Sequence, residues 1–234
     1  MELHWSKFQV LPVQSAGNIR TPDGVALEHT ACMQYLGAHL AADGDQNHEL
    51  GRKMAIAKKD FFVLQKLWSH SSLTWQRKLR IYASLIESRL LYSLASACLI
   101  KVQLRRLDGF QNRCLRYIIG VKPSWISRVA NADVLARTGH TPASKLLLLR
   151  QLQLFGKVLR VDASHPLREN SFIPGTMRAT TERYVRRIGR PCKEFVPDML
   201  EQARILFGDV GAAASSAANR QSWNQALKHK LQVK

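Results

Sequence analysis

Acidic residues are scarce in the middle of this 234-residue chain. Between residues 51 and 160 the sequence has only four of its 17 Asp and Glu but 21 of its 35 Lys and Arg, so this stretch holds nearly all of the net charge of +18. A segment with so little compensating acid repels itself, and proteins keep such an imbalance mainly for polyanionic partners. The sequence therefore predicts a nucleic-acid-binding segment over residues 51–160.

Cysteine motifs and long apolar runs are also missing. The four cysteines form no Cys-x-x-Cys pair and have no His at ligand spacing, which argues against a structural zinc site and against a disulfide framework. The longest apolar stretch near a helix, residues 90–100, falls well short of the ~20 residues that cross a membrane, and the N-terminus lacks a signal-peptide pattern. We expect an intracellular protein with free thiols and no membrane partner.

The motifs of common catalytic sites do not occur. A two-metal phosphoryl-transfer site needs converging carboxylates, but no two Asp residues are adjacent, and Asp43-Gly44-Asp45 reads better as a turn before a helix than as a metal loop. There is no Gly-x-Ser-x-Gly elbow, His-Glu-x-x-His pair or glycine-rich phosphate loop. We expect no catalytic residue and no metal or other cofactor in this chain, which alone should be inert.

The apolar pattern predicts a mainly α-helical fold with a small N-terminal β-hairpin element. Short strands are expected at residues 9–13, 25–27 and 33–40, around the turn signals Pro22-Asp23-Gly24 and Asp43-Gly44. From residue 46 the apolar positions recur every three or four residues, which predicts a helical bundle and then a C-terminal helical pair. Helices are expected at residues 46–68, 73–99 with Leu79, Tyr82, Ile86 and Leu90 inward, 103–119, 127–138, 142–160 with Thr141 as N-cap, 194–207 and 215–231.

Four regions follow from these boundaries. Residues 1–45 form the β element, 46–160 the basic helical domain, 161–192 a linker and 193–234 the C-terminal helical segment. The linker is rich in Arg, Pro, Gly and Thr. Its Gly189-Arg190-Pro191 could lie in an A·T-rich minor groove, although a basic turn leading into the next helix is the favoured interpretation.

Basic residues recur on four of the predicted helices. A basic helix face is often merely solvated, but an excess repeated over several helices with only four acids favours phosphate contact. Such contacts give affinity and salt dependence with little sequence selectivity. The candidate contacts are Arg52, Lys53, Lys58, Lys59, Lys66, Arg77, Lys78, Arg105, Arg106, Arg113, Arg116, Arg150 and Lys157.

Short motifs are spread along nearly the whole chain. They are Leu3-His4-Trp5-Ser6-Lys7, Tyr35-Leu36-Gly37, Leu90-Leu91-Tyr92, Cys114-Leu115-Arg116, Phe155-Gly156-Lys157-Val158-Leu159-Arg160 and Gly189-Arg190-Pro191. Their order and spacing resemble the C-terminal part of a non-LTR (LINE-type) retrotransposon reverse transcriptase, from the end of the palm through the primer-grip hairpin and the thumb. Each motif is short, and only their order makes the resemblance specific.

The resemblance implies a role for several residues. Tyr35-Leu36-Gly37 would form the hairpin that grips the primer end, residues 46–160 would be the thumb, and Lys7 would lie near the phosphates of the incoming nucleotide. The Mg²⁺-binding aspartates would belong to upstream domains of a longer RNA-directed DNA polymerase.

The partners implied are RNA and DNA, with an RNA–DNA hybrid favoured, and those upstream domains; the family's life cycle implies nuclear residence. Two other interpretations stay open. One is a non-catalytic nucleic-acid-binding or adaptor protein, and the other is a decayed retroelement copy whose core still folds.

Overall fold

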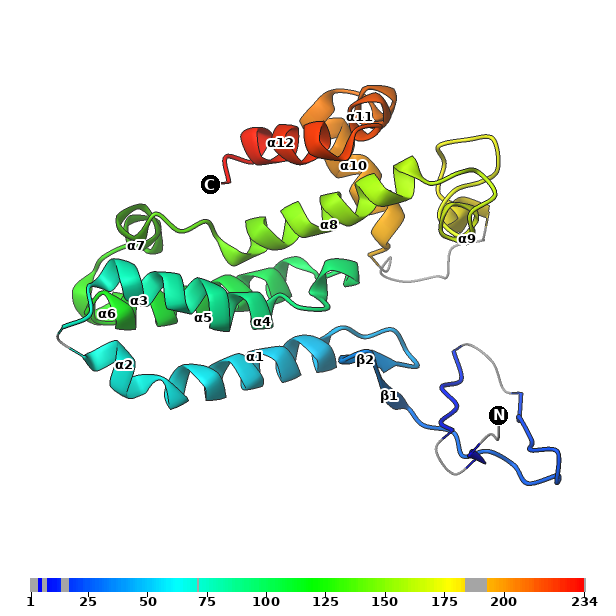
Figure 1. The fold of residues 1–234 in the computed structure, drawn as a ribbon, viewed down its shortest axis with the longest axis horizontal. Coiled ribbons are helices and arrows are strands. Elements are labelled where there is room, and N and C mark those ends of the chain that lie inside the picture. The colour runs from blue at the N-terminus through cyan, green and yellow to red at the C-terminus, as the bar shows by residue number, and fades with distance from the viewer. Residues whose placement is uncertain (1–3, 6–7, 14–16, 71, 184–192, 234) are drawn as a thin grey trace.

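The computed structural model describes residues 4–5, 8–13, 17–70, 72–183 and 193–233. One small hairpin precedes a succession of helices, so the prediction of a mainly α-helical fold with a small N-terminal β-hairpin is confirmed. Figure 1 shows the chain before the hairpin lying to one side of the helices, while α8 runs between two groups of helices.

The hairpin consists of β1 (Cys32–Tyr35) and β2 (Ala38–Ala41), which pair antiparallel with Tyr35 opposite Ala38. The two residues between the strands, Leu36 and Gly37, both have positive φ, +48° and +80°. Positive φ at both central residues is the signature of the type I′ turn, whose twist matches that of the strands. Gly tolerates this conformation, but Leu rarely adopts it.

The expected strands at residues 9–13 and 25–27 do not form. Only isolated bridges join Val10 to His29 and Arg20 to Ala26 in this part of the described chain. Pro12 has no N–H to donate to a ladder, and a run of three residues offers too few hydrogen bonds to hold a strand. The prediction of three strands before residue 41 was therefore wrong at the first two positions.

The first group of helices buries one core around Leu50, Tyr82 and Leu107. Its elements are α1 (Asn47–Val63), α2 (Gln65–Ser69), α3 (Trp75–Ile81), the π-helix η2 (Tyr82–Glu87), α4 (Ser88–Leu90), the 3-10 turn η3 (Leu94–Ser96), α5 (Lys101–Ile118), α6 (Ser124–Ser127), α7 (Asn131–Thr138) and α8 (Ala143–Arg160).

Three predicted helices differ from the structure. The helix expected over residues 46–68 is divided at Leu64 into α1 and α2. The helix expected over residues 73–99 changes to a π-helix at Tyr82 and ends before Ser93, which has φ +69°. The helix expected over residues 127–138 begins only at Asn131, as α7, because Arg128, with φ +53°, ends the preceding helix α6. A residue with positive φ cannot continue a right-handed helix, and neither residue is of a type that signals this conformation in a sequence.

Side chains of α5 cap the start of α8. The Asp108 carboxylate accepts hydrogen bonds from the backbone N–H of Ser144 (2.8 Å) and from its hydroxyl (2.7 Å), and Gln111 Oε1 accepts from the N–H of Ala143 (2.8 Å). Thr141, expected to be the N-cap, instead accepts a hydrogen bond from Gln111 Nε2 through its carbonyl (2.8 Å). The orphan N–H groups of α8 are thus satisfied from another helix, which fixes α8 against α5.

A second core forms on the other side of α8, around Phe155 and Trp223. It is closed by α9 (Pro166–Glu169), the 3-10 turn η4 (Thr180–Arg183), α10 (Phe195–Phe207), α11 (Val210–Ala217) and α12 (Arg220–Lys230). Trp223 stacks on Phe207 with 4.9 Å between ring centroids and donates from Nε1 to the Leu152 carbonyl (3.0 Å). The predicted C-terminal pair is therefore three helices, because Asp209 and Asn219 each cap a new helix start.

Residues 161–183 of the predicted linker pack against α8. The Phe172 side chain is buried, and its ring lies 6.2 Å from that of Phe155. Arg168 donates to the Leu159 carbonyl (2.8 Å). The part of the segment around Arg168 and Phe172 thus belongs to the second core, while Gly189-Arg190-Pro191 lies outside the described residues.

Candidate nucleic-acid interface

The turn at the tip of the hairpin is held from two directions. The Gly37 carbonyl accepts hydrogen bonds from Arg52 Nη2 (2.6 Å) and Lys53 Nζ (3.2 Å), both on α1. The Tyr92 hydroxyl donates to the Leu36 carbonyl (3.3 Å). These bonds hold Leu36 in its unfavourable conformation while its side chain stays 77% exposed.

The carboxylate of Glu49 organises this clamp. It accepts hydrogen bonds from Arg52 Nε (3.0 Å), from the backbone N–H of His39 (3.0 Å) and from the Ser93 hydroxyl (2.5 Å), and Lys53 Nζ lies 3.6 Å away. Burial raises the pKa of the Glu49 carboxyl, but these hydrogen bonds outweigh burial and hold the pKa below its usual value. Ionised Glu49 thus joins β2, α1 and the loop at Ser93.

Three predicted phosphate contacts are buried side chains that hold the fold. Lys53 carries the contacts just described and also lies over the Tyr92 ring, 4.7 Å from its centroid. Lys78 Nζ donates to the Trp68 carbonyl (2.6 Å). Arg116 donates to the loop after α5, including the Val129 carbonyl (2.7 Å). Side chains so enclosed are out of reach of a phosphate at the surface.

The other predicted cations lie mostly at the surface. Those exposed are Lys58, Lys59, Lys66, Arg77, Arg105, Arg106, Arg113 and Lys157, while Arg52 and Arg150 are half-buried and Lys7 lies outside the described residues. Within the described part of the chain, none of the eight exposed cations pairs with a carboxylate.

The four carboxylates of residues 51–160 each have a hydrogen-bond or ion-pair partner other than the exposed cations. Asp60 pairs with Arg89 (2.9 Å), Asp108 caps α8, and Asp133 accepts from the N–H of Ala130 at the start of α7 (3.3 Å). Glu87 accepts a hydrogen bond from Gln111 (3.2 Å). The exposed cations therefore keep their positive charge unneutralised by protein groups.

Helices α1 and α5 run side by side in the same direction. Gln103 Nε2 donates to Asn47 Oδ1 (2.9 Å) at their first turns, and the Phe61 and Tyr117 rings meet edge to face at 5.7 Å near their last turns. Eleven residues make three helical turns. Lys58, eleven after Asn47, therefore lies on the side of α1 that faces α5.

The exposed side chains along this junction are basic and aromatic. Arg106 and Tyr117 are also eleven residues apart on α5, with Arg113 on the same side. On α1, Lys58 Nζ lies 5.9 Å from the centroid of the Phe62 ring. We name these five exposed side chains, Lys58, Phe62, Arg106, Arg113 and Tyr117, the α1–α5 seam. Phosphates and nucleobases are the groups that such a mixture of cations and rings binds.

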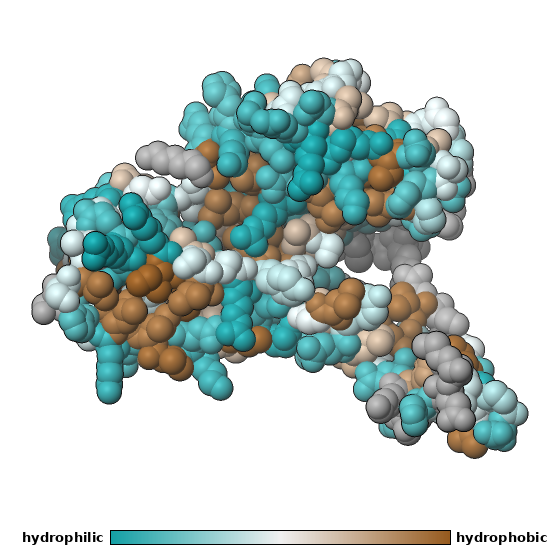
Figure 2. All heavy atoms as spheres, in the orientation of Figure 1, coloured by the Kyte–Doolittle hydropathy of each residue, from teal (hydrophilic) through white to brown (hydrophobic). Residues whose placement is uncertain are grey.

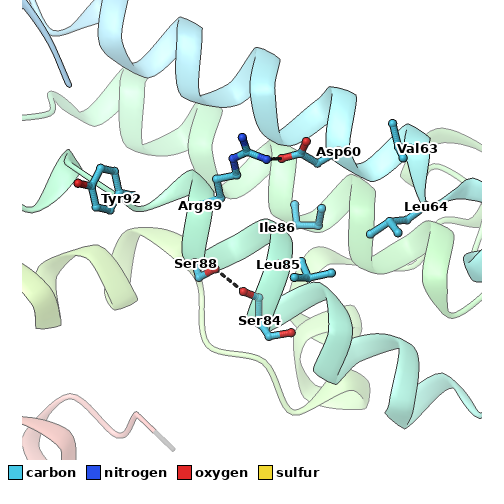
Figure 3. A pocket seen from close by; sticks show the side chains of 9 residues that line it. All are labelled: Asp60, Val63, Leu64, Ser84, Leu85, Ile86, Ser88, Arg89 and Tyr92. Carbon is cyan, nitrogen blue, oxygen red and sulfur yellow. Dashed lines mark hydrogen bonds and ion pairs between the residues drawn. The ribbon is translucent and has the colours of Figure 1, made fainter. Parts of the chain in front are cut away.

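An apolar pocket of about 580 Å³ opens on the opposite side of α1 (Figure 3). Val63, Leu64 and Leu85 line it, and Tyr92 lies at one end. Its charged groups, Asp60 and Arg89, pair with each other. Figure 2 shows hydrophobic side chains gathered over the end of α1 and α2, on the same part of the molecule. This apolar surface is unsuited to a phosphate backbone.

The described residues contain neither a metal-binding cluster nor a membrane-spanning helix. Among the described residues, no group of three or more His, Cys, Asp and Glu side chains could hold a metal ion. Every helix in that part of the chain is too short or too polar to cross a bilayer. What the described surface offers a ligand is positive charge, aromatic rings and hydrogen-bond donors.

Sequence reasoning missed two members of the hairpin clamp. Glu49 had a signal, since it precedes Arg52 and Lys53 by three and four residues, the spacing of side-chain pairs on a helix. Ser93 had none, because its partner Glu49 is 44 residues away in sequence.

Function must be inferred from these residues and their geometry. Comparison of the chain with protein-family models, with curated proteins and with solved structures finds no match in any of the three.

Proposed function

We propose that this chain binds the sugar–phosphate backbone of a template–primer duplex, with an RNA–DNA hybrid favoured, as the primer-grip and thumb part of an RNA-directed DNA polymerase. The observation that carries the proposal is the set of eight exposed cations on α1, α2, α3, α5 and α8 with no carboxylate partner among the described residues. Phosphates supply the counter-charge that the protein itself does not.

The arrangement of the cations suits a helical duplex. They project from several helices rather than from one loop, and the α1–α5 seam places Lys58, Arg106 and Arg113 along two parallel helices. A-form hybrids are recognised mainly through shape and backbone contacts, because their deep major groove admits no side chain. Backbone contacts of this kind need only exposed Lys and Arg at suitable intervals.

The hairpin tip supports the primer-grip part of the proposal. Backbone strain tends to persist at sites where the conformation itself is used. Leu36 combines a positive φ with an exposed side chain and a carbonyl fixed by Tyr92. A tip held this rigidly would keep its position when a strand end is pressed against it.

A binding titration across a salt series tests the proposal. The intact chain is titrated with RNA–DNA hybrid, duplex DNA and single-stranded RNA, and then compared with a variant carrying Arg105→Ala, Arg106→Ala and Arg113→Ala. Each lost phosphate contact should shallow the slope of log K against log salt by about 0.9 on B-DNA. The matched control removes three exposed cations from α12 by Arg220→Ala, Lys228→Ala and Lys230→Ala.

The expected result is tightest binding to the hybrid and a shallower slope for the α5 variant alone. Unchanged affinity in the α5 variant, or an equal loss in the α12 control, would contradict the assigned surface. Equal binding to all three nucleic acids would contradict the hybrid preference and favour the adaptor interpretation.

A further inference from the structure

The short helix α6 carries the most exposed aromatic side chain among the large hydrophobic residues of the described chain. Trp125 is 80% exposed and its neighbour Ile126 is 58% exposed. Exposed cations, Lys122 and Arg128, stand on either side of them in the sequence. Two adjacent large apolar side chains flanked by cations form a small exposed patch, and such patches with a polar rim are where partners and ligands bind.

The loop that carries Trp125 is held in place by hydrogen bonds from the Arg116 side chain. The buried guanidinium donates to the carbonyls of Lys122 (3.2 Å) and Val129 (2.7 Å), and to Asn131 Oδ1 (2.9 Å). It also reaches the Ser127 hydroxyl (3.4 Å). One side chain thus ties both ends of the loop, and the ring is presented on a backbone that loses little freedom on binding.

The loop lies at one end of the α1–α5 seam. Five residues separate the end of α5 from the start of α6, so Trp125 lies near the end of the seam that carries Tyr117. Figure 1 places α6 at that end of the helical body, where α2 also lies. A strand that extends beyond this end of the seam would come close to α6.

We propose that Trp125 is a stacking platform for an unpaired nucleobase, with Lys122 and Arg128 contacting the phosphates on either side of that base. This inference rests on the proposed nucleic-acid binding and adds to it a contact with the base rather than with the backbone. An alternation of flat ring and positive charge matches a single strand, which alternates flat bases with negative phosphates. Two apolar side chains on a four-residue helix are a small anchor for a bilayer, and the flanking cations point to a charged polymer.

The test uses the full chain and an RNA–DNA hybrid with a single-stranded overhang. One probe has a normal overhang and the other has abasic residues there, so that the two differ only in bases. Trp125→Ala is compared with Trp125→Phe, which keeps an aromatic face, and with Trp75→Ala, which removes another partly exposed Trp, on α3. Circular dichroism checks that each variant is folded, as expected at Trp125, whose side chain is mostly in water.

Wild type should bind the normal overhang about 5- to 150-fold more tightly than the abasic one, the range that one stacked base supplies. Trp125→Ala should abolish this difference and keep the salt slope, while Trp125→Phe and Trp75→Ala should preserve most of the difference.

Equal binding of the two probes by wild type, or an unchanged difference in Trp125→Ala, would overturn the inference and leave backbone binding standing. Failure to bind either probe would overturn the proposed function itself. A Trp125-dependent fluorescence change with vesicles of anionic phospholipid, and none with the oligonucleotides, would assign the ring to a membrane surface instead.

Discussion

At the scale of single residues, Leu36 has a strained backbone conformation, with φ at +48°. Leu at positive φ costs about 1 kcal/mol relative to residues that tolerate this region. We expect Leu36→Asn, which creates the Asn-Gly pair preferred in type I′ turns, to raise the free energy of unfolding by about 1 kcal/mol in urea titrations. Nucleic-acid binding should weaken in the same variant if the exposed Leu side chain touches the primer.

The control is Leu40→Asn on β2, where the same change meets an ordinary strand conformation. It should give no gain in stability, because Asn is disfavoured in strands and no strain is relieved there. Equal effects at the two positions would show that turn geometry is not the cause.

Glu87 should make stability depend on pH. Burial raises the pKa of its carboxyl from the ordinary 4.5 to about 7, against the opposing effects of the Gln111 hydrogen bond and the Arg150 charge. Between these two values the folded chain holds a proton that the unfolded chain has released. The free energy of unfolding should therefore fall as pH rises from about 4.5 to 7 and be level above that.

The isosteric variant Glu87→Gln should remove this slope and be more stable than wild type at pH 8 by up to about 3 kcal/mol, since one pKa unit corresponds to about 1.4 kcal/mol. Urea titrations at pH 5, 6, 7 and 8 measure the effect. Glu201→Gln, on the exposed surface of α10, should leave the slope of wild type unchanged. A slope that survives Glu87→Gln would assign it to another group.

At the scale of elements, Gly156 decides how closely α12 approaches α8. A Cβ at this position would collide with the Trp223 indole, whose ring is fully buried. We expect Gly156→Ala to lower the free energy of unfolding by about 1–3 kcal/mol, because the packed ring cannot retreat. Gly109→Ala on α5 meets no atom within 4 Å and should stabilise by about 0.5–1 kcal/mol. Thermal unfolding of both variants provides the comparison.

Helix faces could be predicted from the sequence better than helix ends. Leu79, Tyr82, Ile86 and Leu90 are buried as their spacing indicated, because apolar residues three and four apart share a face in either an α- or a π-helix. The π-helix itself gave no signal, since one extra residue per turn barely disturbs a pattern this short. The break at Ser93 depends on Glu49, which the local pattern around Ser93 does not contain.

At the scale of the whole molecule, the net charge of +18 should oppose folding and favour nucleic acid. Raising NaCl from 50 to 500 mM should therefore increase the thermal midpoint while weakening binding, because salt screens repulsion and attraction alike. The Arg105→Ala, Arg106→Ala, Arg113→Ala variant should gain less stability from salt than wild type. A midpoint that falls with salt in wild type would show that ion pairs dominate over repulsion.

The distribution of charge in the sequence does not predict which Lys and Arg side chains are exposed to solvent. Lys78 and Arg77 are adjacent in sequence, yet Lys78 is buried against the Trp68 carbonyl and Arg77 is exposed. Arg116 likewise belongs to the same helix as Arg113, but is enclosed by the loop that follows it. The tertiary neighbours that satisfy each donor decide the outcome, and they come from distant parts of the chain.

Helix α8 contributes buried side chains to both hydrophobic cores. Its first half packs with Leu147 in the first core, and its second half carries Leu152 and Phe155 into the second. A fragment ending at residue 160 would leave those second-core side chains in water, and it should aggregate rather than behave as an isolated binding domain. The backbone amides at the middle of α8 should accordingly be the last to exchange with deuterium, since neither core can open there without the other.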